Sequence, residues 1–426
     1  MRRRDPASLV QQGIWRTERL CAARSAHHVP LAIRLGGDLD VRALVDACEA
    51  VVARHAVLGA AFHEHGGVPW LGAATVRPHV AHVDLSTAPA HRVGPQLADL
   101  VRRETMRPFD VSRGPLARFT LCRVTRGRHV LVVVAHRLVS DWASEEVLVR
   151  DLTCLYGAFS DGSPGSLPPL PPFRDQVADE QERAAAAREA AAELWAGRWR
   201  EPEAVVLPGL LRPVIGAEPG GCVGVALDAE LGDALDRAAR DLGATRFELL
   251  LAGLQSLLHR CGNAEAVVAT GLSTRTAVTR ECIGPFTNEL PVGLCRPGGT
   301  AFAELVAGVR AELRAAQAVR EIPLASAVPA LGPRVAAAPV SLGYRRRSGD
   351  AGFRGVDTEV EWTIATGTAR NALHLELVDG PGSVGGNLVY APGAMDREAA
   401  AGLAARFTAV LRDAVADVEL PAVPAG

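Results

Sequence analysis

The chain has 426 residues, 48% of them hydrophobic and 22% charged, so it can bury the core of two domains or of one large one. Its formal net charge of −2 argues against a nucleic-acid partner or an anionic membrane surface. All 46 basic residues are arginine, which excludes chemistry that depends on lysine, such as Schiff-base catalysis or a phosphate-binding P-loop.

The eight cysteines are scattered without a C-x-x-C pair, a pattern that disfavours a zinc or dithiol site and favours a reduced, cytoplasmic protein. No group of His, Cys, Asp and Glu has metal-ligand spacing, so we expect no metal site. The start, MRRRDPASLVQQ, has no apolar segment after its basic residues, and we therefore expect no signal peptide. The longest apolar runs are too short to span a membrane.

The first predicted elements are a buried strand at 31–36, a helix at 41–55 and a second buried strand at 130–136. Segment 144–159 has helical spacing of its apolar residues. Ser144 is a suitable N-cap for this helix, and the two glutamates after it favour the positive end of the helix dipole.

The clearest boundary is SDGSPGSLPPLPPF (160–173), where five prolines and two glycines exclude a helix or a central strand. We predict an N-terminal lobe at 1–165, a proline-rich linker at 166–180 and a C-terminal lobe at 181–426. Helices and strands on both sides of the boundary predict an α+β fold with two lobes. The elements expected after the boundary are a helix at about 175–200, a strand near 222–227, helical sequence over 229–261, a strand at 266–270, a helix near 302–319, a strand pair near 358–390 and a helix at 396–416.

Chemistry is concentrated in VLVVVAHRLVSDWAS (130–144), where an apolar strand ends in His136 and Arg137 and Asp141 follows. Taken alone, a histidine at a strand end is more often structural than catalytic. We expect the adjacent pair His27 and His28, which precedes the first strand, to have no catalytic role.

Several segments, taken in chain order, resemble the core motifs of the condensation domains of nonribosomal peptide synthetases. The resemblance covers nearly the whole chain, and the order and spacing of its motifs are more specific than any one of them. The segments are LVQQGIW (9–15), GDLDVRALVDACEAVVARHAVLGAAF (37–62), FDVSRGPLARFTL (109–121), HRLVSDWAS (136–144), IGPFTNELPV (283–292) and GNLVYAPGAMD (386–396).

The resemblance implies two chloramphenicol acetyltransferase-like lobes in a V-shaped arrangement. In this family, thioesters enter through tunnels from opposite faces, carried on the phosphopantetheine of a peptidyl or acyl carrier protein. The resemblance implies no cofactor besides that arm. The second histidine of an H-H-x-x-x-D-G motif is held responsible for amide formation, while the first histidine and the aspartate shape the loop.

Carried over residue by residue, His136 is the first histidine, Arg137 replaces the second, and Asp141 is the aspartate. Trp142 replaces the glycine, and Ser144 is kept. Gly59 stands where the family has an arginine that pairs with the aspartate. The inter-lobe motif is carried by Gly284, Phe286, Asn288 and Pro291.

These changes have physical consequences. A guanidinium remains protonated, so Arg137 cannot serve as a general base, whose loss costs roughly 10²–10⁴ in rate. It could still stabilise an oxyanion. We hypothesise that Arg137 replaces the partner lost at Gly59 and lies within roughly 6 Å of Asp141. Trp142 should narrow or close the tunnel. No other histidine lies near the motifs, so the sequence offers no substitute base.

The His-Arg sequence resembles the X domains of glycopeptide-antibiotic synthetases, which form no peptide bond and recruit cytochrome P450 enzymes to a carrier-bound peptide. Those domains have a second aspartate where this chain has Trp142. Two hypotheses follow, and whether the protein is an enzyme stays open. It is an acyltransferase that forms an amide or ester with His136 or substrate positioning replacing the base, or a non-catalytic platform for a carrier protein and a tailoring oxygenase. We expect a monomer.

Overall fold

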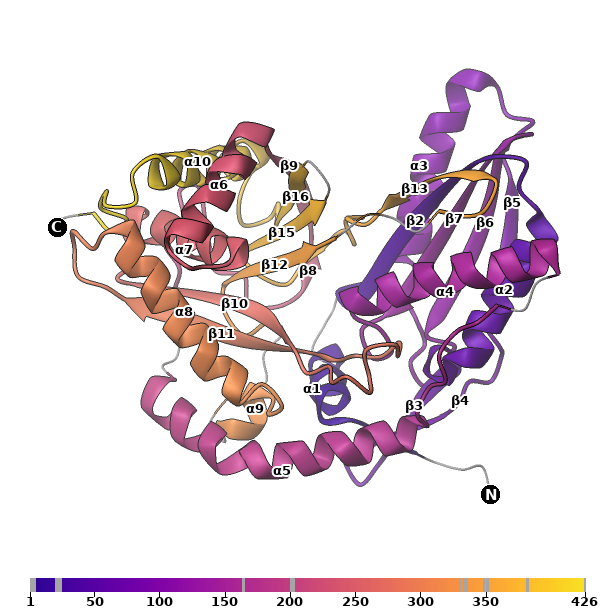
Figure 1. Ribbon diagram of the computed structural model, residues 1–426, viewed down its shortest axis with the longest axis horizontal. Helices are drawn as coiled ribbons and strands as arrows, with labels where there is room; N and C mark the ends of the chain where they lie inside the picture. Colours follow the sequence, from indigo (N-terminus) through magenta and orange to yellow (C-terminus); the bar gives the residue numbers. More distant parts are fainter. Residues whose placement is uncertain are drawn as a thin grey trace.

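The computed structural model describes residues 5–19, 25–162, 165–199, 204–328, 331, 336–347, 349, 352–380 and 383–424. Over these residues the chain forms two lobes that lie side by side, each built on one large sheet with helices packed against it (Figure 1). The predicted α+β class is confirmed. No helix among the described residues is both long and apolar enough to cross a bilayer.

Helices and strands follow one another along both lobes. The helices are α1 (Leu9–Glu18), α2 (Val41–Arg54), the 3₁₀ helix η1 (Ala56–Gly59), α3 (Ala90–Met106), α4 (Trp142–Asp161), α5 (Phe173–Arg198), α6 (Ala229–Asp241), α7 (Arg246–Arg260), α8 (Phe302–Ala318), α9 (Leu324–Ala327) and α10 (Arg397–Ala416). The strands are β1 (Asp5–Pro6), β2 (His28–Gly37), β3 (Ala60–His65), β4 (Val68–Ala73), β5 (Val80–Asp84), β6 (Ala117–Thr125), β7 (Arg128–His136), β8 (Glu218–Pro219), β9 (Gly221–Leu227), β10 (Glu265–Ser273), β11 (Thr287–Cys295), β12 (Val340–Arg346), β13 (Val356–Glu361), β14 (Thr368–Ala369), β15 (Leu373–Gly380) and β16 (Ser383–Tyr390).

The N-terminal lobe is built on the sheet β13-β2-β7-β6-β5. Its central strand β7 is buried at every position after Arg128, as expected of a continuous run of β-branched residues covered on both faces. β7 pairs antiparallel with β2, and this register places His136 opposite His28. The chemistry-bearing end of β7 is therefore fixed by the strand pairing.

The C-terminal lobe is built on the sheet β11-β10-β12-β15-β16-β9. Helix α7 is buried along nearly its whole length, packs on β10 and contacts α8 and α10. Pro291 lies in β11, at the edge of this sheet, where a missing backbone N–H is tolerated. This lobe presents β10, β12 and β15 to the lobe interface described below.

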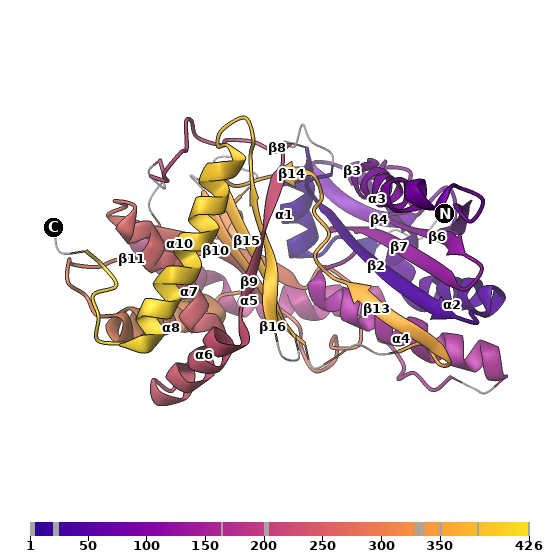
Figure 2. The same cartoon turned by 90° about the horizontal axis from the view of Figure 1, so that it is seen from above.

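Two segments connect the lobes in ways the sequence did not indicate. Helix α5 runs beneath both lobes in Figure 1, and it begins at Phe173, so the expected linker at 166–180 ends inside a helix. Strand β13 belongs to the sequence range expected for the C-terminal lobe, yet it pairs antiparallel with β2 in the N-terminal sheet (Figure 2). The expected boundary at residue 181 therefore does not separate the lobes completely, because β13 follows it in the chain and yet belongs to the N-terminal sheet.

Candidate functional site

The site begins in the loop that joins β7 to α4. Asp141 is the N-cap of α4, and its carboxylate accepts a hydrogen bond from the backbone N–H of Ser144 at 2.8 Å. The Ser144 hydroxyl lies 2.7 Å from the same carboxylate and accepts from the backbone N–H of Gly284 at 3.0 Å. The HRLVSDWAS loop is thereby bonded to the inter-lobe motif of the other lobe.

The hypothesis that Arg137 pairs with Asp141 is wrong. Arg275, from the C-terminal lobe, donates to Asp141 Oδ1 at 2.7 Å, and Arg137 makes no ion pair with Asp141 among the described residues. Phe286 N–H and Thr287 Oγ1 donate to Asp141 Oδ2 at 3.1 and 3.0 Å.

Burial opposes ionisation of Asp141, but Arg275 and the Ser144 donors outweigh it and hold the pKa of Asp141 below its usual range. The partner lost at Gly59 is thus replaced from the opposite lobe. A side chain at Gly59 would instead meet Pro78 and Val52, at 3.7 and 4.0 Å.

The inter-lobe motif serves this same connection. The Arg275 guanidinium lies over the Phe286 ring, 4.5 Å from its centroid. A Cβ on Gly284 would come within 2.5 Å of the Phe286 ring, so glycine is needed for this packing. Asn288 lies further along, in β11, where its side-chain amide donates to the carbonyl of Arg320 at 3.0 Å.

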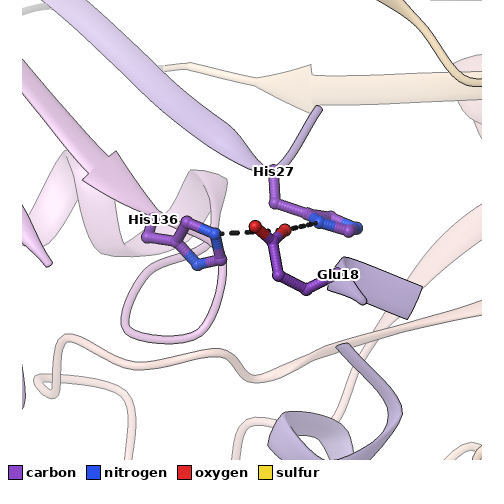
Figure 3. A group of neighbouring side chains, drawn as sticks. All are labelled: Glu18, His27 and His136. Carbon is purple, nitrogen blue, oxygen red and sulfur yellow. Dashed lines mark hydrogen bonds and ion pairs between the residues drawn. The ribbon is translucent and has the colours of Figure 1, made fainter. Parts of the chain in front are cut away.

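His136 is fully buried, and both of its ring nitrogens face polar groups. The backbone N–H of Leu138 points at its Nδ1 at 3.1 Å, so Nδ1 must be the unprotonated nitrogen of the neutral ring. Its Nε2–H therefore faces Glu18 Oε2, 3.4 Å away. Figure 3 shows the Glu18 carboxylate between the rings of His136 and His27, whose Nδ1 lies 2.5 Å from Glu18 Oε2.

The group Glu18, His27 and His136 is compact enough to be considered as a metal site, because the candidate ligand atoms lie within 4.8 Å of one another. The Leu138 N–H opposes this assignment, since it leaves Nε2 of His136 protonated. Burial lowers the pKa of His27 to about 4. Burial favours the protonated form of Glu18, but the two histidines outweigh this effect and hold the pKa of Glu18 well below its usual range. We interpret the group as a carboxylate hydrogen-bonded to His27, with the neutral ring of His136 facing it at 3.4 Å.

The side chain of Arg137 does not join this group but faces the space between the lobes. Its backbone N–H donates to the His27 carbonyl at 2.7 Å, and its side chain lines a cavity of about 130 Å³ between the lobes. The guanidinium makes no hydrogen bond or ion pair with any residue that the structure describes. Burial, with added repulsion from Arg370, lowers the pKa of Arg137 to about 10, so it remains a cation at neutral pH.

The far wall of this cavity comes from the C-terminal sheet, and it carries polar residues that the sequence did not reveal. Ser341 Oγ lies 2.8 Å from His374 Nδ1, and Arg370 pairs with Glu289 at 3.0 Å. Burial, reinforced by Arg370, lowers the pKa of His374 to about 4, so its ring is neutral at pH 7. Strand pairing of β12 with β15 brings Ser341 and His374 together, which no sequence spacing could indicate.

Trp142 lies between this cavity and a larger open groove of about 900 Å³, and it lines both. Its ring packs on Gly343 of β12 so closely that a Cβ there would be 1.9 Å from Trp142 Cη2. The Arg345 guanidinium lies 5.2 Å from the centroid of the same ring. The residue at the family's glycine position therefore spans the gap between the lobes.

Comparison with known proteins agrees with this fold and motif order. The Condensation domain family matches residues 1–422. Phosphinothricin tripeptide synthetase PhsB of Streptomyces viridochromogenes is 29% identical over 434 residues, which cover 98% of this chain and 36% of that protein. The chain thus spans little more than a third of that synthetase.

Solved structures also match over the full chain. The first condensation domain of the calcium-dependent antibiotic synthetase has a TM-score of 0.83 at 21% identity, with 99% of this chain and 98% of that chain covered. The complex of the X-domain and OxyB from teicoplanin biosynthesis has a TM-score of 0.81 at 27% identity, with coverages of 99% and 95%. The protein belongs to the Condensation domain family, and the resemblance and two-lobed fold inferred from the sequence are confirmed.

Proposed function

We propose that this protein is a platform of nonribosomal peptide antibiotic biosynthesis that binds an acyl or peptidyl thioester on its carrier protein and does not form an amide by the family's usual route. We further propose that it works in the cytoplasm, consistent with its seven described cysteines, which are all free. One observation carries the proposal. The residue at the position of the catalytic second histidine is Arg137, a permanent cation whose guanidinium lines the inter-lobe cavity.

The neighbouring His136 does not offer a replacement base. Leu138 N–H occupies its Nδ1, and its Nε2–H is directed at Glu18. A general base needs a free lone pair within reach of the proton that it removes. Neither nitrogen of His136 meets this requirement, and this supports a structural role.

The position of Trp142 supports the same proposal, because it affects how substrates reach the cavity. The family's chemistry needs two substrates to meet, whereas here an indole packed on Gly343 lies between the cavity and the open groove. The X-domain, itself solved in complex with OxyB, is 27% identical to this chain. We therefore propose that a tailoring oxygenase is the second partner of the platform.

The experiment mixes the protein with donor and acceptor carriers loaded with aminoacyl thioesters and follows both amide product, by mass spectrometry, and complex formation, by analytical ultracentrifugation. The proposal expects stoichiometric binding of a loaded carrier and no amide. Product that disappears in Arg137→Ala would contradict it.

A second candidate function, acyl transfer, is favoured by Ser341 and His374. If Ser341 holds the Nδ1–H of His374, the Nε2 lone pair of this neutral ring is free, since Nε2 has no partner among the described residues. His374 would then be the base and Arg137 would stabilise the oxyanion. In the same assay, amide or ester product that His374→Gln abolishes and Ser341→Ala weakens would establish this function. If the wild type formed no product with any pair of loaded carriers, the acyl-transfer function would be rejected.

A further inference from the structure

The arginines that line the inter-lobe cavity, or that bind the acids lining it, are partnered by carboxylates, with one exception among the described residues. The pairs are Arg275 with Asp141 at 2.7 Å, Arg345 with Glu145 at 2.6 Å, and Arg370 with Glu289 at 3.0 Å. Arg137 has none. Arg137 is partly buried and lines the cavity without an ion-pair partner in the part of the chain that the structure describes, so its guanidinium keeps donors available for an anion there.

The cavity's own acids do not supply that anion. Asp141 and Glu289 belong to the pairs above, and Glu376 lies 3.4 Å from Arg345, which it shares with Glu145. Burial raises the pKa of Glu145 to about 7, with Arg345 opposing it, and burial also raises the pKa of Glu376. Glu289, Asp141 and Glu376 favour the charged form of Arg137 from a distance, but none of them forms an ion pair with it, because each is bound to another arginine.

We propose that the cavity is a carboxylate-binding site in which Arg137 binds the free carboxylate of an acyl or amino acid ligand. The planar guanidinium offers a two-pronged set of donors that matches a carboxylate. A cavity of about 130 Å³ holds several water molecules and hence a short acidic group. Ser341 and His374 line the same space and offer neutral polar contacts.

The charge of the walls favours a carboxylate over a phosphate. Asp141, Glu289 and Glu376 all line the cavity, so a doubly charged phosphate would face three carboxylates with one uncommitted cation. One negative charge balances Arg137. The carboxylate has two possible sources, an acidic acyl group tethered as a thioester or a free acid, and only the tethered source rests on the proposed platform function.

The test measures dissociation constants by titration calorimetry for four probes. Succinyl-pantetheine and its neutral isostere succinamoyl-pantetheine represent the tethered source, and the singly charged free acid butyrate and its neutral amide butyramide represent the untethered one. The proteins are the wild type, Arg137→Met, Arg137→Lys and a control, Arg92→Met, which removes an exposed arginine on α3. Circular dichroism establishes that each variant is folded.

The wild type and Arg92→Met should bind the acid of at least one pair tenfold or more tightly than its amide. Arg137→Met should abolish that preference without weakening amide binding, and Arg137→Lys should retain part of it. Equal affinities for acid and amide in the wild type would overturn the proposal, as would a preference that survives in Arg137→Met. If Arg137→Met does not fold, a wild-type melting temperature raised equally by acids and amides would overturn it, whereas a rise with acids alone supports it.

This result is separable from the proposed function. Binding of free butyrate that depends on Arg137, without binding of any loaded carrier, would establish the carboxylate site and reject the carrier platform. Binding of loaded carriers without discrimination between the succinyl and succinamoyl groups would support the carrier platform and reject the carboxylate site.

Discussion

The carboxylate of Asp141 accepts five hydrogen bonds, from Ser144, Arg275, Phe286 and Thr287, which come from both lobes. A carboxylate in this position works as a structural connection, because all its strong acceptor directions are occupied. Asp141 is held in this way although Gly59 offers it no charged partner. In this chain the ion pair of Asp141 crosses the interface between the lobes, because Arg275 comes from the C-terminal lobe.

Removing the ion pair of Arg275 with Asp141 should destabilise the folded protein. Arg275→Met leaves Asp141 buried without its cation, and we expect a loss of about 3–5 kcal/mol in the free energy of unfolding, measured with urea. The matched control is Arg412→Gln, which breaks an exposed pair with Asp228 (2.7 Å) and should cost less than about 1 kcal/mol. Equal losses in the two variants would contradict the structural role of Asp141.

Gly343 and Trp142 form a second test at the level of single residues. Gly343→Ala forces the indole to move, and overpacking of this kind costs about 1–3 kcal/mol of stability. Gly224→Ala, at a strand glycine whose added Cβ has no neighbour within 4 Å, should change stability by less than about 0.5 kcal/mol. The double variant Gly343→Ala with Trp142→Phe should recover part of the loss in urea unfolding, and no recovery would show that Trp142 is not what Gly343 accommodates.

The sequence alone could locate the site residues that lie close together in the chain, but not those that only the fold brings together. His136, Arg137 and Asp141 lie in one local motif, and the sequence was sufficient to locate them. Arg275 and His374 reach the site only through contacts between distant strands and loops, and no local spacing reports such contacts. The pairing of Arg137 with Asp141 was wrong for this reason.

At the scale of elements, hydrophobic spacing predicted most helices, and turn chemistry decided where they break. The sequence predicted helical structure over 229–261 without a break, whereas the structure has α6 and α7 with Gly243 between them at a φ of 57°. Thr245 and Glu248 then form a capping box that starts α7. This start signal is local, so the sequence itself contains it.

Helix α5 contacts α1 through Glu180, whose buried carboxylate accepts the backbone N–H of Leu9 at 2.8 Å. Burial raises the pKa of Glu180 to about 7 from a model-peptide value of about 4.5. The groups that face it, besides the backbone of Leu9 and Val10, are Arg183 and Glu321. Because the folded state binds this proton more tightly, its stabilising contribution is complete below pH 4.5 and is lost as the pH rises towards 7.

Glu180→Gln keeps an acceptor for Leu9 and removes the titration. Between pH 5 and pH 8, the wild type should lose on the order of 2 kcal/mol of unfolding free energy relative to this variant. Glu182→Gln, at an exposed position on the same helix, should follow the wild type at both values. Urea titrations at the two pH values check this, and parallel behaviour of all three proteins would contradict a proton on Glu180.

At the scale of the whole molecule, the two lobes share a strand and an ion pair. β13 leaves the C-terminal lobe to join β2, and Arg275 reaches Asp141 from the same side of the interface. Strand patterning could predict that a strand lies in this region but not which sheet it joins, because β13 adds to the edge of the other lobe's sheet and its partner β2 lies near the start of the chain. The lobes are therefore held in a fixed relation around the cavity, which suits a preformed binding site.

The proposed platform function attributes the absence of amide formation to Arg137 and Trp142 together, so reversing both should produce it. Arg137→His supplies a base worth roughly 10²–10⁴ in rate, but the indole packed on Gly343 still lies between the cavity and the open groove. Trp142→Gly joins the cavity to the open groove but leaves no base. We expect no amide from either single variant with loaded donor and acceptor carriers, and product at least tenfold above background from the double variant, measured by mass spectrometry. Asp141 keeps Arg275 as its partner in all three proteins, so the loop stays in place. An equal rate in the wild type and the double variant would instead show that Arg137 already belongs to a working catalytic site.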